Sequence, residues 1–458
     1  MGRYLLAFLL TTYFLSSKSI DGTLIDMVRY SQSNFTTNAR SAGLGIAYNG
    51  ILNDNASIVN NPAGLTLTNL SELSIGLNHR MNSNLYSFLS YENETESNNT
   101  FLNDLSIAGP VFENLESEEN LYFGLSYNSF AITNRLISYD VFNPGLSYTG
   151  FEINNNRQWT RNLSLENESF SIVEDELNQN YSLVENGRKH NLSIALASEI
   201  EEDFSIGGGI NIAYGFFEYD RVFLESDEPN IDDGFDEVRH TLSYSHDYIS
   251  ASFNIGIMYN LDSNYRFTFN FITPESMLVD ELFIERATLT QDDGRRYSYD
   301  NLVASSSSVY KVSLPWKIDL GASYKLNDLT VAGAVRLKEY NSIDFYEAED
   351  QYFLDLNDIV NEQLKTSFEF GAGFEYNIPY TIFEVRGGYT AITSPIVGND
   401  KITELISAGI SMYLFKGMRI DVFYQNQRFD ERLYLYGNTA LQNNIDTKTF
   451  GLGLTYRY

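Results

Sequence analysis

The residues best able to do chemistry in this 458-residue chain are a small group of histidine and hydroxyl side chains. His240 and His246 lie close in the sequence to Ser243, Ser245 and Asp247. A serine nucleophile needs an adjacent base and a third group that orients the base, so this cluster is the candidate for hydrolysis. Its spacing matches no hydrolase motif, and we therefore expect no catalytic residue and no enzyme.

Thiol and metal chemistry find little support in the composition. The chain has no cysteine, which excludes a thiol nucleophile, a disulfide scaffold, a Cys-ligated metal and a lipoprotein anchor. The four histidines are His79, His190, His240 and His246. Their spacing fits no helical metal motif, so we expect surface or barrel-wall histidines, no metal site and no cofactor.

The formal net charge of −31 excludes whole classes of partner. Nucleic-acid binding requires a basic face, and an anionic leaflet would repel such a chain. The acidic residues concentrate in two runs, 218–247 and 339–365. These runs are compatible with solvated loops, with a Ca²⁺ site, or with divalent ions that bridge to lipid headgroups.

The N-terminus carries an export signal. Arg3 precedes an almost entirely apolar stretch, 4–15, and Ser17 and Ser19 are small residues suited to cleavage after position 19. A membrane-spanning helix needs roughly 20 apolar residues, and no stretch of the chain approaches that length. We therefore predict a signal peptide over 1–19 and an exported protein.

The elements that follow alternate between apolar and polar residues. In the last segment, one face carries Phe450, Leu452, Leu454, Tyr456 and Tyr458, whereas the other carries Thr449, Gly451, Gly453, Thr455 and Arg457. The segments 204–217, 264–272 and 317–325 alternate in the same way. A transmembrane strand shows one face to lipid and the other to the lumen, so this period is typical of a membrane β-barrel.

A soluble β-sandwich also alternates, but three features favour the membrane. Aromatic residues cluster at strand ends, the presumed inner faces carry charges and glycines, and short turns alternate with long polar connections. The long connections fall at 131–189, 218–247, 273–316, 338–366 and 429–447. The predicted strands are 72–90, 104–111, 120–130, 190–199, 204–217, 248–260, 264–272, 317–325, 328–337, 367–376, 381–390, 402–414, 418–428 and 448–458. The predicted fold is an all-β transmembrane antiparallel barrel of about fourteen strands over 71–458.

Fourteen strands enclose more space than side chains fill, because about eight already give a packed interior. Residues 20–70 precede the first strand and do not alternate, so we predict that they form a hatch that plugs the lumen. Gly43 and Gly45 permit close backbone approach and positive φ. Residues 47–52 can form a short helix, and Asn61-Pro62-Ala63 predicts a sharp turn that Asn61 can cap. We take these glycines and this turn as the hatch site.

The same segment resembles the outer-membrane hydrophobic-compound transporters, the long-chain fatty-acid transporter (FadL/TodX) family. Shared features are the run Asn38 to Ala47 with its Ala-Arg and Gly-x-Gly, then Asn53-Asp54-Asn55-Ala56-Ser57, then Asn60-Asn61-Pro62-Ala63-Gly64-Leu65. Two internal stretches, Ile272 to Met277 and Leu314-Pro315-Trp316-Lys317, are also similar to family sequence. The chain departs from the family at Leu314, where threonine is usual, and at Asn53-Asp54-Asn55, where two consecutive acids are common.

The resemblance implies passive transport of hydrophobic compounds, such as long-chain fatty acids, across a Gram-negative outer membrane. In the implied route a ligand binds among the extracellular loops, passes the hatch and leaves sideways into the bilayer. Outer-membrane lipid, lipopolysaccharide and the assembly machinery are the other implied partners. A barrel subunit of a protein secretion system, from the same superfamily, remains an alternative, and a non-specific porin is disfavoured by the hatch motif.

The ligand-binding residues are not fixed by the sequence. The connections 131–189 and 273–316 carry apolar side chains that could meet a ligand or pack against one another: Leu136, Ile137, Val141, Phe142, Leu278, Leu282, Phe283 and Ile284. Lys311 and Arg295 are candidates for meeting a carboxylate. No kink in the third strand can be assigned, since Gly124 is the only glycine there.

Overall fold

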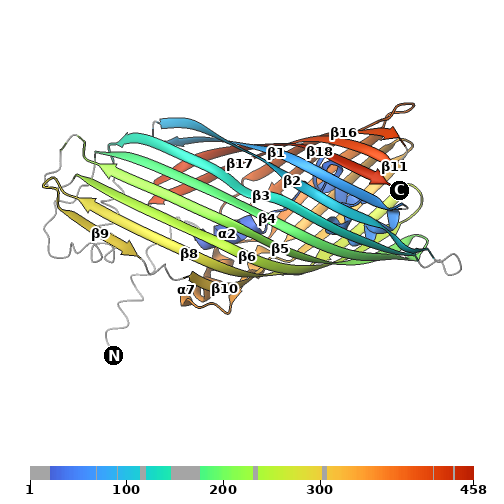
Figure 1. The fold of residues 1–458 in the computed structure, drawn as a ribbon, viewed down its shortest axis with the longest axis horizontal. Helices are drawn as coiled ribbons and strands as arrows, with labels where there is room; N and C mark the ends of the chain where they lie inside the picture. The colour runs from blue at the N-terminus through green and yellow to red at the C-terminus, as the bar shows by residue number, and fades with distance from the viewer. Residues whose placement is uncertain are drawn as a thin grey trace.

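The chain folds into a single closed β-barrel (Figure 1). The computed structural model describes residues 21–68, 70–89, 91–113, 120–145, 176–228, 230, 236–301, 307–415, 417–436 and 439–458. The strands are β1 (Glu72–Phe88), β2 (Tyr91–Glu113), β3 (Asn120–Asn143), β4 (Leu177–Glu201), β5 (Phe204–Ser226), β6 (Glu237–Asn260), β7 (Tyr265–Ile272), β8 (Glu275–Thr290), β9 (Arg296–Asn301), β10 (Ser307–Leu314), β11 (Lys317–Leu326), β12 (Leu329–Lys338), β13 (Asp344–Tyr346), β14 (Ser367–Asn377), β15 (Phe383–Thr393), β16 (Ile402–Phe415), β17 (Met418–Tyr436) and β18 (Thr439–Arg457). The barrel closes where β1 pairs with β18, from Glu72 opposite Arg457 to Ser87 opposite Gln442.

The wall has fourteen barrel strands, as predicted, when two strands interrupted part-way are each counted once. β7 and β8 are two parts of one barrel strand, because both pair with β6. β10 and β11 are likewise two parts of one barrel strand, which pair with β8 and β7. Each interruption contains a proline, Pro274 or Pro315, which has no backbone N–H to donate to the ladder. The short strands β9 and β13 are additions at the rim that pair with β8 and β10. The prediction of one continuous first strand over 72–90 is confirmed by β1.

Side chains divide between the two faces of the wall as the alternation predicted. On β4 the large apolar residues Leu192, Ile194 and Leu196 are 41–49% exposed on the outside, whereas Ser193 and Ala195 are buried inside. An apolar outer band on a closed sheet is the arrangement that a lipid bilayer requires, since closure lets neighbouring strands pair their backbone groups within the wall. Among the described residues, no helix is long and apolar enough to cross a membrane.

The strands extend well beyond this band, which corrects the predicted loops. The stretches 131–189, 218–247, 273–316 and 429–447 contain the outer halves of β3, β4, β5, β6, β8, β17 and β18. These outer halves extend to one end of the barrel, on the left in Figure 1. The prediction failed because many outward residues there are polar, as Ser138 and Asp140 of β3 and Asn180 of β4 are, so regular apolar alternation ends while pairing continues. The connection 338–366 folds as η4 (Tyr340–Ser342), β13, α7 (Gln351–Asp355) and α8 (Asn357–Gln363).

The N-terminal segment lies inside the barrel, as the predicted hatch requires (Figure 1). It forms α2 (Gly22–Tyr30), α3 (Ala39–Ala42), η1 (Gly45–Gly50), α4 (Ser57–Asn60) and η2 (Pro62–Leu67). The helix expected over 47–52 is the 3₁₀ turn η1, which begins two residues earlier. The predicted signal peptide, 1–19, lies outside the described residues.

Candidate functional site

The hatch glycines act in two different ways. Gly45 has φ of +60°, and a Cβ there would lie 2.7 Å from Thr390 Oγ1, so both backbone and space require glycine. Gly43 has φ of −66°, so it does not use the positive φ that glycine permits. Its requirement is close approach, because a Cβ at Gly43 would lie 2.8 Å from the Arg386 side chain.

The turn at Asn61-Pro62-Ala63 forms as predicted. The Asn61 side chain accepts a hydrogen bond from the Ala63 N–H at 3.1 Å, and Pro62 occupies the first position of η2. This turn lies directly against the wall, because a Cβ added at Gly207 would lie 2.6 Å from Ala63 N. The Asn61 amide also donates to the Phe269 carbonyl at 3.0 Å and so ties the hatch to β7.

Glycines of the opposite wall receive the other side of the hatch. A Cβ at Gly321 would lie 2.6 Å from Asn49 O, and Cβ atoms at Gly371 and Gly388 would collide with Ile46 and Leu44. The segment from Leu44 to Asn49 therefore packs its backbone against β11 and β15 and the Ile46 side chain against β14. The alternating pattern places these glycines on inner faces, and that inward position is the sequence signal for the surface on which the hatch sits.

Buried ion pairs anchor the hatch to the wall. Arg40 of α3 donates from Nε to Glu375 of β14 at 2.7 Å and lies 3.3 Å from Asp54 of the hatch. Asp54 also lies 3.4 Å from Arg419 of β17. All four side chains are at most 6% exposed. Removing one charge from such a network leaves its partner buried without full compensation.

The pKa of Asp54 reflects this network. Burial alone would raise the pKa, but the Arg40 and Arg419 guanidiniums outweigh it, and the Tyr48 hydroxyl adds a hydrogen bond of 2.7 Å. Together they lower the pKa of Asp54 to about 2. The hatch therefore holds an ionised Asp54 at neutral pH.

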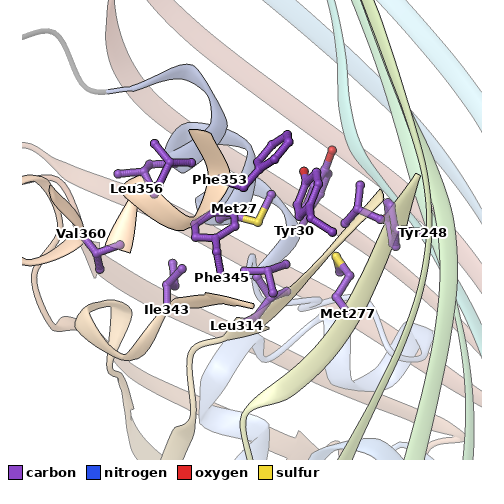
Figure 2. Close-up of a cluster of buried hydrophobic side chains, with 14 of the residues drawn as sticks. Met27, Tyr30, Tyr248, Met277, Leu314, Ile343, Phe345, Phe353, Leu356 and Val360 are labelled. Carbon is purple, nitrogen blue, oxygen red and sulfur yellow. The ribbon is translucent and has the colours of Figure 1, made fainter. Parts of the chain in front are cut away.

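Helix α2 fills the middle of the barrel. Asp21 caps it by accepting from Thr23 N–H at 2.9 Å, and the buried Leu24, Met27 and Tyr30 recur at helical spacing on one face. Figure 2 shows Met27 and Tyr30 between wall residues such as Tyr248 and Met277 and the rim segment that carries Phe345 and Phe353. This helix was not predicted from the sequence.

A cavity of about 1000 Å³ lies beside α2 and above the hatch. Its walls include Ile25, Val28 and Arg29 of α2, the segment 32–36, and inner faces of β1, β3, β17 and β18. Both apolar and polar groups line it. This size is at the upper end of sites for small molecules, roughly 300–1,000 Å³.

The barrel wall is incompletely paired beside this cavity. Strands β2 and β3 pair from Glu113 opposite Asn120 only as far as Asp104 opposite Asn128. Above that point β2 pairs with β1 and β3 pairs with β4, but residues 98–103 and 129–133 face each other without a ladder. We call these two stretches the unpaired interval. Phe101 and residues 130–133 belong to it and also line the cavity.

Side chains close the wall above the unpaired interval. The Asn134 carbonyl of β3 accepts from Ser97 Oγ at 2.8 Å and from Asn82 Nδ2 at 2.9 Å, and the Leu136 carbonyl accepts from the Thr95 hydroxyl. In the interval itself, the Arg188 guanidinium carbon lies 4.7 Å from the Phe101 ring centroid. A cation–π contact of this kind contributes on the order of 1 kcal/mol and can be broken without disrupting a ladder.

A β-bulge displaces β3 at the interval. Ala131 pairs with Arg188 and Thr133 with Gly187, so Ile132 is the extra residue. Gly187 lies opposite the bulge, where a Cβ would be in ordinary contact with Ile132 Cβ at 3.6 Å and more tightly placed against Phe217 at 3.0 Å. This distortion needs no glycine in β3 itself, and the sequence analysis consequently missed it.

The hatch touches both edges of the interval at its lower end. Asn103 of β2 donates from Nδ2 to the Thr36 carbonyl at 2.5 Å, and Asn128 of β3 donates to the Thr37 carbonyl at 2.7 Å. Two consecutive hatch residues thus bridge the strands where their ladder stops.

A ring stack marks the height of the interval. Tyr127, His190 and Tyr214 lie side by side on neighbouring strands just below it, with ring centroids 6.0 Å and 4.7 Å apart. Aromatic rings of this kind occupy the boundary between lipid and water in membrane barrels. The interval therefore opens near the outer edge of the apolar band.

The other predicted candidates lie away from the cavity. Of the eight apolar residues proposed for ligand contact, none lines it; Ile137 packs inside a separate cluster, and Leu136, Phe142, Leu278 and Leu282 are 37–45% exposed. They lie on paired strands whose alternation turns them to different faces. Lys311 pairs with Glu347, and Arg295 pairs with Asp293 at 2.7 Å, both on the exposed surface.

The histidine cluster does not assemble into a hydrolytic site. His240 and His246 point inward, to Glu285 at 2.8 Å and Glu281 at 2.7 Å, whereas Asp247 faces outward on the same strand. Ser243 and Ser245 lie an even number of residues from Asp247 on the same strand, so they share its face and not that of the histidines. Among the described residues, no group of three or more acidic or histidine side chains is placed to hold a metal ion.

Solved structures share this architecture. A Pseudomonas aeruginosa FadL homologue matches with a TM-score of 0.56 and 12% identity, over 92% of this chain and 98% of that chain. The Pseudomonas putida toluene transporter TodX matches with a TM-score of 0.55 and 11% identity, over 88% of this chain and 94% of that chain. The chain therefore shares the fold of this FadL homologue and of TodX. No family model matches the sequence, and no curated protein matches it. The apolar band and closed wall agree with a place in a Gram-negative outer membrane.

Proposed function

We propose that this protein transports hydrophobic compounds, including long-chain fatty acids, passively from the cell exterior into the outer membrane. The observation that carries the proposal is the unpaired interval, because the cavity ends at a part of the wall that lacks a ladder. An apolar tail gains about 0.8 kcal/mol for each methylene it buries, so such a cavity lowers the cost of crossing the polar outer zone.

In the proposed route, ligand enters the cavity beside α2 and leaves sideways between β2 and β3. The Arg188–Phe101 contact is the side-chain closure, since it spans the interval without backbone bonds. Movement of Thr36 and Thr37 would release Asn103 and Asn128 and widen the lower end. The hatch would then act as a regulator of the exit as well as a plug.

Deletion of Ile132 tests the lateral exit. The deletion removes the extra residue of the bulge while every other residue of β3 keeps its face, because Ala131 and Thr133 already pair with consecutive residues of β4. We expect β3 to straighten and close toward β2. Substitution of Ile132 by alanine retains the bulge and is the matched control.

The assay is uptake of labelled oleate and toluene by a Gram-negative host that lacks its own transporters, at matched outer-membrane abundance. The wild type and Ile132→Ala should support uptake, and the deletion should reduce it at least several-fold. Uptake by the deletion variant equal to that of the wild type would remove the lateral exit. Uptake of neither compound by the correctly folded wild type would remove the proposed function.

A further inference from the structure

Arg80 is a basic side chain in the cavity that lacks an acidic partner. It lies on the inner face of β1, half-buried, and no carboxylate of a described residue lies within 4.0 Å of it. The neighbouring cavity residues Arg29, Arg135 and Lys338 differ, because each forms an ion pair with a glutamate. A partly desolvated guanidinium without a counter-charge is unfavourable unless something else compensates it.

The guanidinium is nevertheless held in a defined position. Its Nε donates to Asn82 Oδ1 at 3.2 Å, and its Nη1 donates to the Ala131 carbonyl at 2.6 Å. Asn82 is itself fixed, since it accepts from Thr447 at 2.8 Å and donates to the Asn134 carbonyl. An arginine has five N–H donors, so the two bonds made with described residues leave donors available for a ligand.

The surroundings of Arg80 suit an anion. Asn78 and Asn84, on the same face of β1, line the cavity, and within the described part of the chain neither Nδ2 has a hydrogen-bond partner. The cavity lining carries six basic and five acidic side chains in a protein whose net charge is −31. An anion that would be repelled by most of this surface therefore meets a locally balanced site.

Apolar groups adjoin the same place. Ala131, whose carbonyl Arg80 contacts, belongs to the unpaired interval, and Phe101, Phe130 and Ile132 line the cavity there. We propose that Arg80 binds the carboxylate of a single-tailed amphiphile whose tail lies along the unpaired interval. The proposal rests on the proposed transport function and assigns the head-group site within it. A guanidinium matches the planar geometry of a carboxylate in a way that an ammonium does not.

The test compares oleate with oleyl alcohol, which has the same tail and no charge. Binding of each is measured by calorimetry on the purified, folded protein in uncharged detergent. We expect the wild type to bind oleate roughly ten- to a hundredfold more tightly than the alcohol, the range for hydrogen bonds to a charged group. Arg80→Gln should lose this preference and keep its affinity for the alcohol, whereas Arg80→Lys should keep part of it.

Arg428→Gln is the matched control, because Arg428 is exposed, lies outside the cavity lining and should leave the preference unchanged. Equal affinity of the wild type for oleate and the alcohol would overturn the proposal, whether or not the Arg80 variants fold. A preference that survives in folded Arg80→Gln would overturn it as well. Binding of neither probe by the wild type would instead count against the transport function itself.

Discussion

Asp54 is the residue whose replacement should loosen the hatch most selectively. Its carboxylate meets Arg40 at 3.3 Å, Arg419 at 3.4 Å, the Tyr48 hydroxyl at 2.7 Å and the Ala56 N–H at 3.0 Å. Asp54→Asn keeps the shape but removes the charge, and one of its two positions becomes an N–H₂ group that faces cations.

The expected loss of hatch stability depends on the ion pairs that Arg40 and Arg419 keep. Breaking a buried ion pair by removing one partner costs roughly 3–5 kcal/mol. Here Arg40 retains Glu375 and Arg419 retains Asp421 at 2.8 Å, which reduces the loss. We therefore expect the hatch to be destabilised by about 2–3 kcal/mol, which corresponds to roughly 30- to 150-fold faster local opening.

Hydrogen exchange of the folded protein in micelles measures this opening directly. The amides to follow are those bonded within the hatch, such as Asn60 to Ala56 at 3.1 Å and Gly64 to Asn61 at 3.0 Å. The barrel strands should exchange as in the wild type. Asp293→Asn is the control, since its pair with Arg295 is exposed and should contribute nothing measurable. Unchanged hatch exchange in Asp54→Asn would refute the assignment of this network as the anchor.

Two further outcomes follow from the hatch. The pKa of Asp54 is lowered from 3.8 to about 2, so the stabilisation of the hatch by the ionised carboxylate is complete above pH ~5 and is lost as the pH falls toward 2. Over that window, hydrogen exchange of the wild-type hatch, corrected for its intrinsic pH dependence, should accelerate. Asp54→Asn should lack this pH-dependent acceleration. Gly45→Ala should destabilise the hatch by about 1–2 kcal/mol from the positive φ at this position alone. Gly22→Ala is the control and should be neutral or slightly stabilising, because nothing lies within 4 Å of the added Cβ. Equal thermal stability of the two variants would contradict the strain argument.

The sequence predicted the part of the fold that the bilayer enforces. Alternation located all fourteen barrel strands, and the hatch motif located the plug. These residues are constrained directly by contact with lipid and by the need to pair every backbone polar group. The upper wall was missed, since outside the bilayer a strand such as β2 no longer needs apolar residues on its outer face. Helix α2 was missed as well, although Asp21 and the spacing of Leu24, Met27 and Tyr30 were visible.

The candidate site was less predictable than the fold. The bulge at Ile132 appears only in the pairing of β3 with β4, and the unpaired interval depends on where β2 leaves β3. Neither relation is local in sequence. The unpaired charge of Arg80 becomes visible only after the glutamate partners of its neighbours Arg29, Arg135 and Lys338 are known.

The most direct test of the transport account is a crystal structure of the protein with a fatty acid brominated near its terminal methyl group. The account predicts the carboxylate at Arg80 and an anomalous bromine peak among Phe101, Phe130 and Ile132, at the edge of the unpaired interval. Bromine density confined to the outer apolar surface, with the cavity filled by water, would contradict it.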